Sequence, residues 1–235
     1  MVNNGYTDKV VISVGGSLIV PDGGIDSKFL KDLNVFVREQ LAKNKNRQFF
    51  LITGGGMTTR YYQAAARNVI GHQLSEDDLD WIGIHATRLN GHLLRTIFRD
   101  IAHPVIIDDY SIIRKPTEPV VVGAGWKPGW STDYDAVCVC EDYGVKLIIN
   151  LSKVGKVYNK DPRKFKGAKP LSKISWPDFR KKMGNKWIPG MNLPFDPVAV
   201  EKAQQLGLKV VLMGKDFGNV KKFFKGEKFV GTTIE

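Results

Sequence analysis

Short apolar segments alternate with longer amphipathic segments along the chain. The apolar segments are rich in Val, Ile, Leu and Phe, which is typical of strands buried on both faces; they cover residues 9–14, 48–53, 104–108, 119–122, 146–151 and 209–213. Apolar positions recur with a helical period between them, which predicts helices over residues 27–44, 58–69, 76–99, 133–143 and 197–206. This alternation predicts an α/β protein, a three-layer sandwich with a mostly parallel, open central sheet covered on both faces.

Hydroxyl side chains mark the starts of two predicted helices. Ser75 with Asp78 resembles a capping box, in which each residue bonds the backbone of the other. Ser131 or Thr132 is a candidate cap for the helix over residues 133–143.

Glycine is concentrated in the loops that follow the predicted strands. Ligands of such sheets bind beyond the C-terminal ends of the strands, and bare glycine backbone lets N–H groups meet an anion directly. The glycine-rich loops are residues 15–18 (GGSL), 54–60 (GGGMTTR), 123–133 (GAGWKPGWSTD) and 152–162 (SKVGKVYNKDP). Any one of them can be a structural turn, but their convergence on one sheet edge predicts a phosphate site.

The common phosphate-binding motifs do not explain these loops. Neither Gly155 with Lys156 nor Gly214 with Lys215 completes the P-loop pattern, and the dinucleotide pattern G-x-G-x-x-G fails at each strand-to-helix turn. Arg60 lies in the first turn of a predicted helix, where its charge opposes the helix dipole. An anionic partner explains Arg60 better than a surface position does.

Composition and charge narrow the possible partners. The chain has 235 residues, 43% of them hydrophobic, which is enough for one large α/β domain, and its formal net charge is +11. Residues 153–186 hold twelve Lys or Arg residues against Asp161 and Asp178, a net +10. This block can be a solvated face or can attract nucleic acid or polyphosphate. A solvated face is the commonest of these, and because no stacking motif or DNA-binding element accompanies the block, polyphosphate is favoured over nucleic acid.

Membrane and metal sites are not expected. No apolar run approaches 18 residues and no secretory signal is recognisable, so a cytoplasmic location without membrane contact is expected. Cys138 and Cys140 lie two apart in a predicted helix, point in different directions and are interpreted as buried thiols. His85 and His92 lack a third ligand nearby, so no protein-held metal is predicted.

Several strings occur in the order found in one known family. They are GGSLIVP (residues 15–21), GGGMTTRYY (54–62), DWIGIHATRLNGHLL (80–94), KPGWSTD (127–133), VYNKDP (157–162), FDPVAVEKA (195–203) and the C-terminal GTTIE. With these strings the sequence resembles the amino acid kinase superfamily, and within it the UMP kinases of the archaeal type. The resemblance implies a single domain over residues 1–235 that transfers the γ-phosphoryl group of ATP to UMP, with Mg²⁺ carried by ATP.

The resemblance also implies the layout of the site. Residues 1–150 would form the acceptor half and residues 151–235 the ATP half. The residues assigned to ATP are Gly15, Gly16, Gly55, Arg60, Ser152, Tyr158 and Asp161. Those assigned to UMP are Gly54, Asp80, Gly125, Trp126, Lys127, Pro128, Gly129, Trp130, Ser131 and Thr132. The catalytic candidates are Gly16, Arg60 and Lys153.

Some of these acceptor residues have a second interpretation. Asp80 resembles the family's ribose-binding acid, but a carboxylate at a helix N-terminus is also favourable without a ligand. Trp126 and Trp130 can stack on a base or pack in a subunit contact. The family's usual hexamer, a trimer of dimers, makes the helix over residues 76–99 a candidate interface, although this helix can equally pack on the sheet.

The sequence departs from the family at two positions. Many relatives carry a lysine where Ser13 stands, and an Asp-Gly pair where Gly155 and Lys156 stand. One hypothesis is that Lys153, Lys156 or Lys186 supplies the missing catalytic charge. The alternative is a solvated lysine face, with catalysis by backbone and Mg²⁺ alone.

Other functions stay open. Kinases of the same fold for acetylglutamate, aspartate, carbamate or isopentenyl phosphate are one alternative, although Arg60 after the triple glycine and the string DWIGIHATRLN favour a nucleoside monophosphate. The two departures keep open a non-catalytic relative that binds nucleotide or oxyanions for storage or regulation. A nucleic-acid-binding module is the least favoured.

Overall fold

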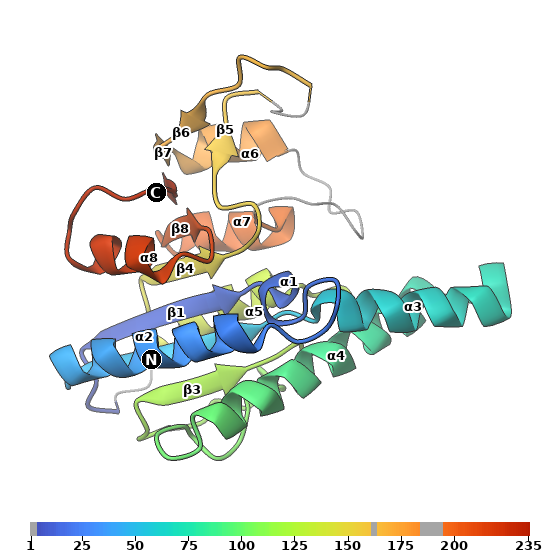
Figure 1. Cartoon of the computed structure of the whole chain (residues 1–235), viewed down its shortest axis with the longest axis horizontal. Coiled ribbons are helices and arrows are strands. Elements are labelled where there is room, and N and C mark those ends of the chain that lie inside the picture. The colour runs from blue at the N-terminus through green and yellow to red at the C-terminus, as the bar shows by residue number, and fades with distance from the viewer. Residues whose placement is uncertain (1–3, 161–163, 184–194) are drawn as a thin grey trace.

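One mostly parallel sheet organises the chain (Figure 1). A computed structural model describes residues 4–160, 164–183 and 195–235. The central sheet has seven strands in the order β3-β2-β1-β4-β8-β9-β7, all paired in parallel except β8 with β9. Its strands are β1 (Asp8–Val14), β2 (Arg47–Thr53), β3 (Val120–Gly123), β4 (Leu147–Leu151), β7 (Lys173–Ile174), β8 (Lys209–Met213) and β9 (Thr232–Ile234). A separate two-stranded sheet pairs β5 (Val157–Tyr158) with β6 (Pro170–Leu171).

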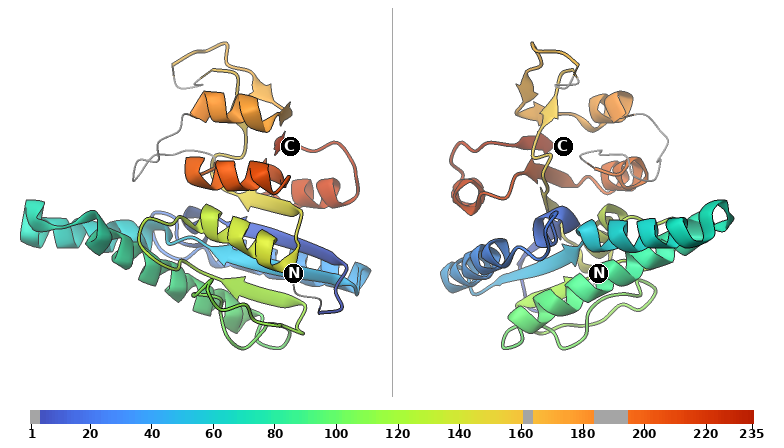
Figure 2. Two further views of the ribbon diagram at one scale, coloured as in Figure 1. Left: turned by 180° about the vertical axis from the view of Figure 1, so that it is seen from behind. Right: turned by 45° about the vertical axis from the view of Figure 1, so that its right-hand side comes forward.

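Helices cover both faces of the central sheet (Figure 2). The helices are α1 (Gly16–Ile19), α2 (Ser27–Lys43), α3 (Gly56–Ile70), η1 (Gly71–Gln73), α4 (Glu76–Ile97), α5 (Thr132–Tyr143), α6 (Trp176–Met183), α7 (Pro197–Gln205) and α8 (Phe217–Phe224). Alternate β1 residues face opposite layers: Val10 and Ile12 pack in the cluster with α2 and α8, and Val11 packs in the cluster with α5 and α7. The predicted three-layer α/β fold is therefore confirmed.

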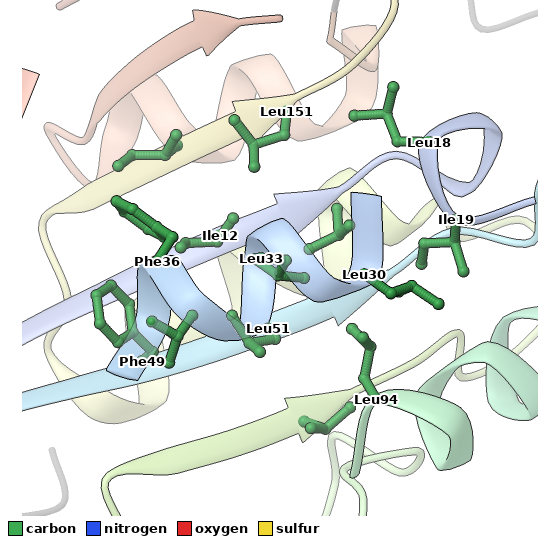
Figure 3. Packing of buried hydrophobic residues seen from close by; sticks show 14 of the residues in the cluster. Ile12, Leu18, Ile19, Leu30, Leu33, Phe36, Phe49, Leu51, Leu94 and Leu151 are labelled. Carbon is green, nitrogen blue, oxygen red and sulfur yellow. The ribbon is translucent and has the colours of Figure 1, made fainter. Parts of the chain in front are cut away.

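The first core layer lies between α2 and the sheet (Figure 3). Leu33 and Phe36 of α2 meet Ile12, Phe49 and Leu51 of the central strands, and all are fully buried. Asp26 caps α2 by accepting a hydrogen bond from the Phe29 amide at 2.9 Å.

The predicted caps of α4 and α5 are also confirmed. Ser75 and Asp78 form a capping box, and the Ser131 side chain accepts from the Tyr134 amide at 3.2 Å. The cap of α5 is therefore Ser131, and Thr132 is its first helical residue.

The prediction of a strand over residues 104–108 was wrong. Only Ile107 of this segment forms an isolated bridge to β3, and Ala102 before it forms another. The His103 amide donates to Val120 O and the Ile107 amide donates to Val122 O. Pro104 lies between them and has no amide proton to continue the pairing. The sequence pattern also missed α1, α6, α8 and the short strands β5, β6, β7 and β9, which are too brief for periodicity to reveal.

The interpretation of Cys138 and Cys140 as buried thiols is confirmed, because both are buried and free. Among the described residues, no helix combines the length and the apolar character that a membrane span requires.

The packing of α2 predicts a stability difference between adjacent residues. Phe36 is fully buried and its ring centroid lies 5.1 Å from that of Phe217, whereas Val35 is 46% exposed. Phe36→Ala is expected to lower the free energy of unfolding by about 3–5 kcal/mol, since it removes apolar contacts and leaves a cavity. Urea denaturation measures this, with Val35→Ala as the matched control, expected to change stability by about 0.5 kcal/mol or less. Equal effects of the two variants would contradict this packing.

Candidate functional site

Two glycine loops meet backbone to backbone at the C-terminal edge of the sheet. The Gly15 amide donates to Leu151 O at 2.8 Å, and the Gly54 amide donates to Val14 O at 3.0 Å, so each loop is tied to a neighbouring strand end. A β-carbon on Gly16 would lie 2.6 Å from Gly55 N, and one on Gly54 would lie 2.6 Å from Gly16 N. Only glycine allows this approach, which explains the repeated glycines.

The glycine loops form part of the wall of a cavity of about 770 Å³. The cavity brings together much of the predicted site, because residues from the ends of β1, β2 and β3 and from α4 line it. The predicted residues that line it are Gly16, Gly55, Arg60, Asp80, Gly125, Trp130, Ser131 and Thr132. The predicted residues outside its lining are Gly15, Gly54, Trp126, Lys127, Pro128 and Gly129.

Sequence reasoning missed several residues of this cavity. Thr59 precedes Arg60 on α3, Gln63 and Arg67 follow it, and Ile84 and Thr87 face them from α4. The helical spacing of Arg60 and Arg67 was the available signal, since residues seven apart lie on the same helix face.

The positive charge at this cavity comes from α3. Arg60 is exposed, and its Nη1 contacts Met57 Sδ at 3.7 Å; it forms no ion pair with the residues that the structure describes. Gly55 precedes α3 without a side-chain cap. The Met57 amide of the first turn donates to Val20 O at 2.9 Å, so the Gly56 and Thr58 amides are the ones that can meet a ligand. Arginine and uncapped helical amides together suit an anion.

The loop over residues 125–132 is held from α4. Thr87 Oγ1 accepts from the Gly125 amide at 2.8 Å, and Asp80 Oδ2 accepts from the Gly129 amide at 2.8 Å. Arg88 donates to the carbonyls of Gly125 and Trp126 at 3.1 and 3.0 Å. Asp80 thus fixes the loop through one carboxylate oxygen, and its role toward a ribose stays a prediction.

Aromatic contacts stiffen the same loop. The Trp126 and Trp130 rings meet edge to face with centroids 4.8 Å apart, and Tyr134 packs on Trp130 at 4.4 Å. The Lys127 ammonium lies 4.3 and 4.6 Å from the two indole centroids. Trp126 packs against the core, and Trp130 lines the cavity.

A second cavity, of about 620 Å³, lies where β4 and β8 end. Tyr158, which the resemblance assigns to ATP, lines it together with Lys153 and Lys156, two lysines of the hypothesis about the missing charge. Further lining residues that the sequence did not single out include Lys215, Asp216, Asn219 and Lys222, which the unpredicted helix α8 and its preceding loop contribute. Cations from two loops therefore surround this cavity.

Of the other residues considered for the ATP side, the structure describes Ser152 and Gly155. Ser152 does not line the second cavity; its hydroxyl bonds Val154 O at 3.0 Å within its own loop. A β-carbon on Gly155 would lie 2.8 Å from Met213 C, so glycine there permits close contact with β8. Asp161 and Lys186 lie outside the described residues.

Ser13, which stands where many relatives have a lysine, contacts a carboxyl group. Its hydroxyl donates to Asp133 Oδ1 at 3.2 Å, Asn150 Nδ2 donates to the same oxygen at 3.0 Å, and the Asp196 amide donates to Oδ2 at 3.2 Å. Burial, and then the nearby Asp196 carboxylate, raise the pKa of Asp133 to about 7. A protonatable group therefore lies beneath the glycine loops.

No metal-binding cluster of three or more His, Cys, Asp or Glu side chains occurs among the described residues. His85 contacts the Trp81 ring, with centroids 6.1 Å apart.

Known proteins resemble this chain over almost its whole length. Residues 8–214 match the model of the amino acid kinase family. The uridylate kinase of Thermoplasma volcanium is 32% identical over 97% of this chain and 98% of its own length, and that of Methanospirillum hungatei is 31% identical over 96% and 94%. The crystal structure of uridylate kinase from Archaeoglobus fulgidus is 29% identical and matches with a TM-score of 0.80 over 97% of this chain and 100% of that chain.

The raised pKa of Asp133 predicts a pH-dependent stability. The folded protein keeps this proton up to about pH 7, whereas the ordinary value is 3.8, so stability falls as pH rises through this window. Asp133→Asn removes the titration, and from pH 5 to pH 8 its free energy of unfolding should improve relative to the parent protein by about 2 kcal/mol. Urea denaturation at both pH values measures the difference. A difference that does not change with pH would contradict the assignment.

Proposed function

Because the chain belongs to the amino acid kinase family, we propose that it is a UMP kinase, which transfers the γ-phosphoryl group of ATP to UMP and releases UDP and ADP. The observation that carries the proposal is the backbone contact between residues 15–16 and 54–56, with Arg60 beside it and the loop over residues 125–132 across the cavity. This arrangement offers amides and a guanidinium to phosphates from two sides. The uridylate kinases named above support the choice of acceptor.

Phosphoryl transfer needs little covalent work from the protein and much positioning of charge. A phosphate oxygen of UMP forms the bond to the γ-phosphorus while the bond to the bridging oxygen of ADP breaks. We assign Gly15, Gly16 and Gly55 to the ATP phosphates. Gly54 and Arg60 belong at the point where the two nucleotides meet, since Arg60 has no acidic partner among the described residues.

The acceptor nucleoside is assigned to the loop over residues 125–132. Its backbone and Thr132 would read the uracil edge, Trp130 would contact the base, and Asp80 would accept from the ribose hydroxyls. The edge-to-face packing of Trp126 and Trp130 supports a rigid wall for the base.

The donor nucleoside is assigned to the second cavity. Tyr158 lies on its wall with Lys153 and Lys156, so the adenosine and the outer phosphates would meet an aromatic ring and ammonium groups. On this layout residues 1–150 form the acceptor half and residues 151–235 the ATP half of one domain.

Mg²⁺ fits the site as a companion of ATP. It usually binds substrate phosphates, one or two carboxylates and several waters, so it needs no dedicated cluster of protein ligands. When bound it would neutralise charge on the β- and γ-phosphates. The chain's own amides and Arg60 would hold the remaining phosphate oxygens.

We also propose a homohexamer built as a trimer of dimers, in the cytoplasm, acting in pyrimidine nucleotide biosynthesis. Leu79, Ile84 and Leu94 of α4 pack inside the chain. Trp81 and Leu89 are exposed, and no residue of α3 is buried, so these helices have apolar surface available for a second copy.

The acceptor specificity tests the proposed function. ADP release from Mg·ATP is measured with UMP, CMP, dTMP, AMP and GMP in parallel, and turnover is expected with UMP above the others. Nucleotide binding without turnover of any acceptor would instead favour a storage or regulatory protein.

Lys153 and Lys156 of the second cavity, together with Lys186, test how the charge lost at Ser13 is replaced. The triple variant Lys153→Ala, Lys156→Ala and Lys186→Ala should lower kcat/KM for ATP about 10-fold or more, because cations at the phosphates favour both encounter and binding.

A matched control removes the same charge elsewhere. Lys43, Lys45 and Lys228 are exposed and lie outside both cavities, and their triple alanine variant should retain activity. Unchanged kcat/KM for ATP in the first variant would mean that its lysines are a solvated face.

A further inference from the structure

One buried side chain of α4 forms hydrogen bonds with the carbonyl groups of the loop over residues 54–56. Asn90 is 3% exposed, and its Nδ2 donates to Gly54 O at 2.8 Å and to Gly55 O at 3.2 Å. In a trans peptide the N–H group points opposite to the carbonyl of the same unit. Holding these two carbonyls therefore turns the Gly55 and Gly56 amides away from Asn90.

Those two amides belong to the cavity wall. Gly55 and Gly56 both line the cavity, and their nitrogens lie where a side chain on Gly16 would collide with them. Asn90 itself is not among the lining residues. It acts on the cavity through the glycine backbone and not by contact with a ligand.

The same helix holds the opposite wall. Thr87 lies three residues before Asn90, hence on the same face of α4, and its hydroxyl accepts from the Gly125 amide at 2.8 Å. Thr53 Oγ1, at the end of β2, donates to Thr87 O at 3.0 Å and to Gly123 O at 3.1 Å. Both loops that line the cavity are therefore held by hydrogen bonds from the same helix, α4.

We infer that Asn90 is a positioning residue for phosphoryl transfer, which sets the glycine-loop amides against the acceptor held by the opposite loop. The inference rests on the proposed function for the reaction it affects. Because Thr87 and Arg88 hold the acceptor loop independently, loss of Asn90 should disturb transfer more than acceptor binding.

Asn90→Leu keeps a similar volume and removes the amide donor. Its kcat should fall about 10- to 100-fold, since small misplacement of a reacting group has effects of this size, while KM for UMP changes less than about 3-fold. Amide hydrogen exchange of residues 54–57 should become faster, with no change at residues 125–130. Asn34→Leu, on α2 and outside both cavities, is the matched control and should change neither quantity.

Failure of the proposed role of Asn90 and failure of the proposed UMP kinase function would give different results. Unchanged kcat, an equal effect on KM, or unchanged exchange at residues 54–57 would overturn the role of Asn90. Failure of the parent protein to phosphorylate UMP would contradict the proposed acceptor, and the exchange result would still decide whether Asn90 holds the loop. If Asn90→Leu does not fold, Asn90→Ser, whose shorter hydroxyl donor cannot replace both bonds, is expected to show the same split to a smaller degree.

Discussion

The close contact between the backbones of residues 15–16 and 54–56 constrains the rest of the structure. It needs β1 and β2 side by side in parallel register, so that their C-terminal ends deliver both loops to one point. It also excludes side chains at Gly16 and Gly54, since a β-carbon there would overlap the facing backbone. This constraint leaves backbone amides exposed on the cavity wall, beside Arg60 and the start of α3, which has no side-chain cap. Such a surface suits phosphate.

Helix α4 bonds the loops on both sides of the cavity. Asn90 fixes the carbonyls of the glycine loop, whereas Thr87, Arg88 and Asp80 fix the loop over residues 125–132. Both walls thus depend on one helix that is buried against the sheet through Leu94. A kinase that works mainly by positioning two anions needs such a common frame.

The sequence predicts those features of the fold and of the candidate site that depend on residues close together in the chain. Apolar periodicity located the main strands and helices, and glycine at strand ends indicated the sheet edge where the first cavity lies. Long-range contacts left no such signal. Pro104 interrupts a predicted strand, and Ser13 bonds Asp133 of a distant helix. The loop before α8 brings Lys215 to the second cavity, and α8 itself brings Lys222. The function of Asn90 could not be found by motif, because it depends on which carbonyls its amide reaches in the folded chain.

The most direct measurement is a crystal structure with UMP and a non-hydrolysable ATP analogue bound together. We expect the γ-phosphate to lie over the amides of Gly16 and Gly55, with the UMP phosphate next to it and Arg60 in contact with both. The uracil should lie against the loop over residues 125–132. Phosphates bound away from the glycine loops, such as in the cavity between α2 and α8 lined by Lys28 and Lys31, would contradict it.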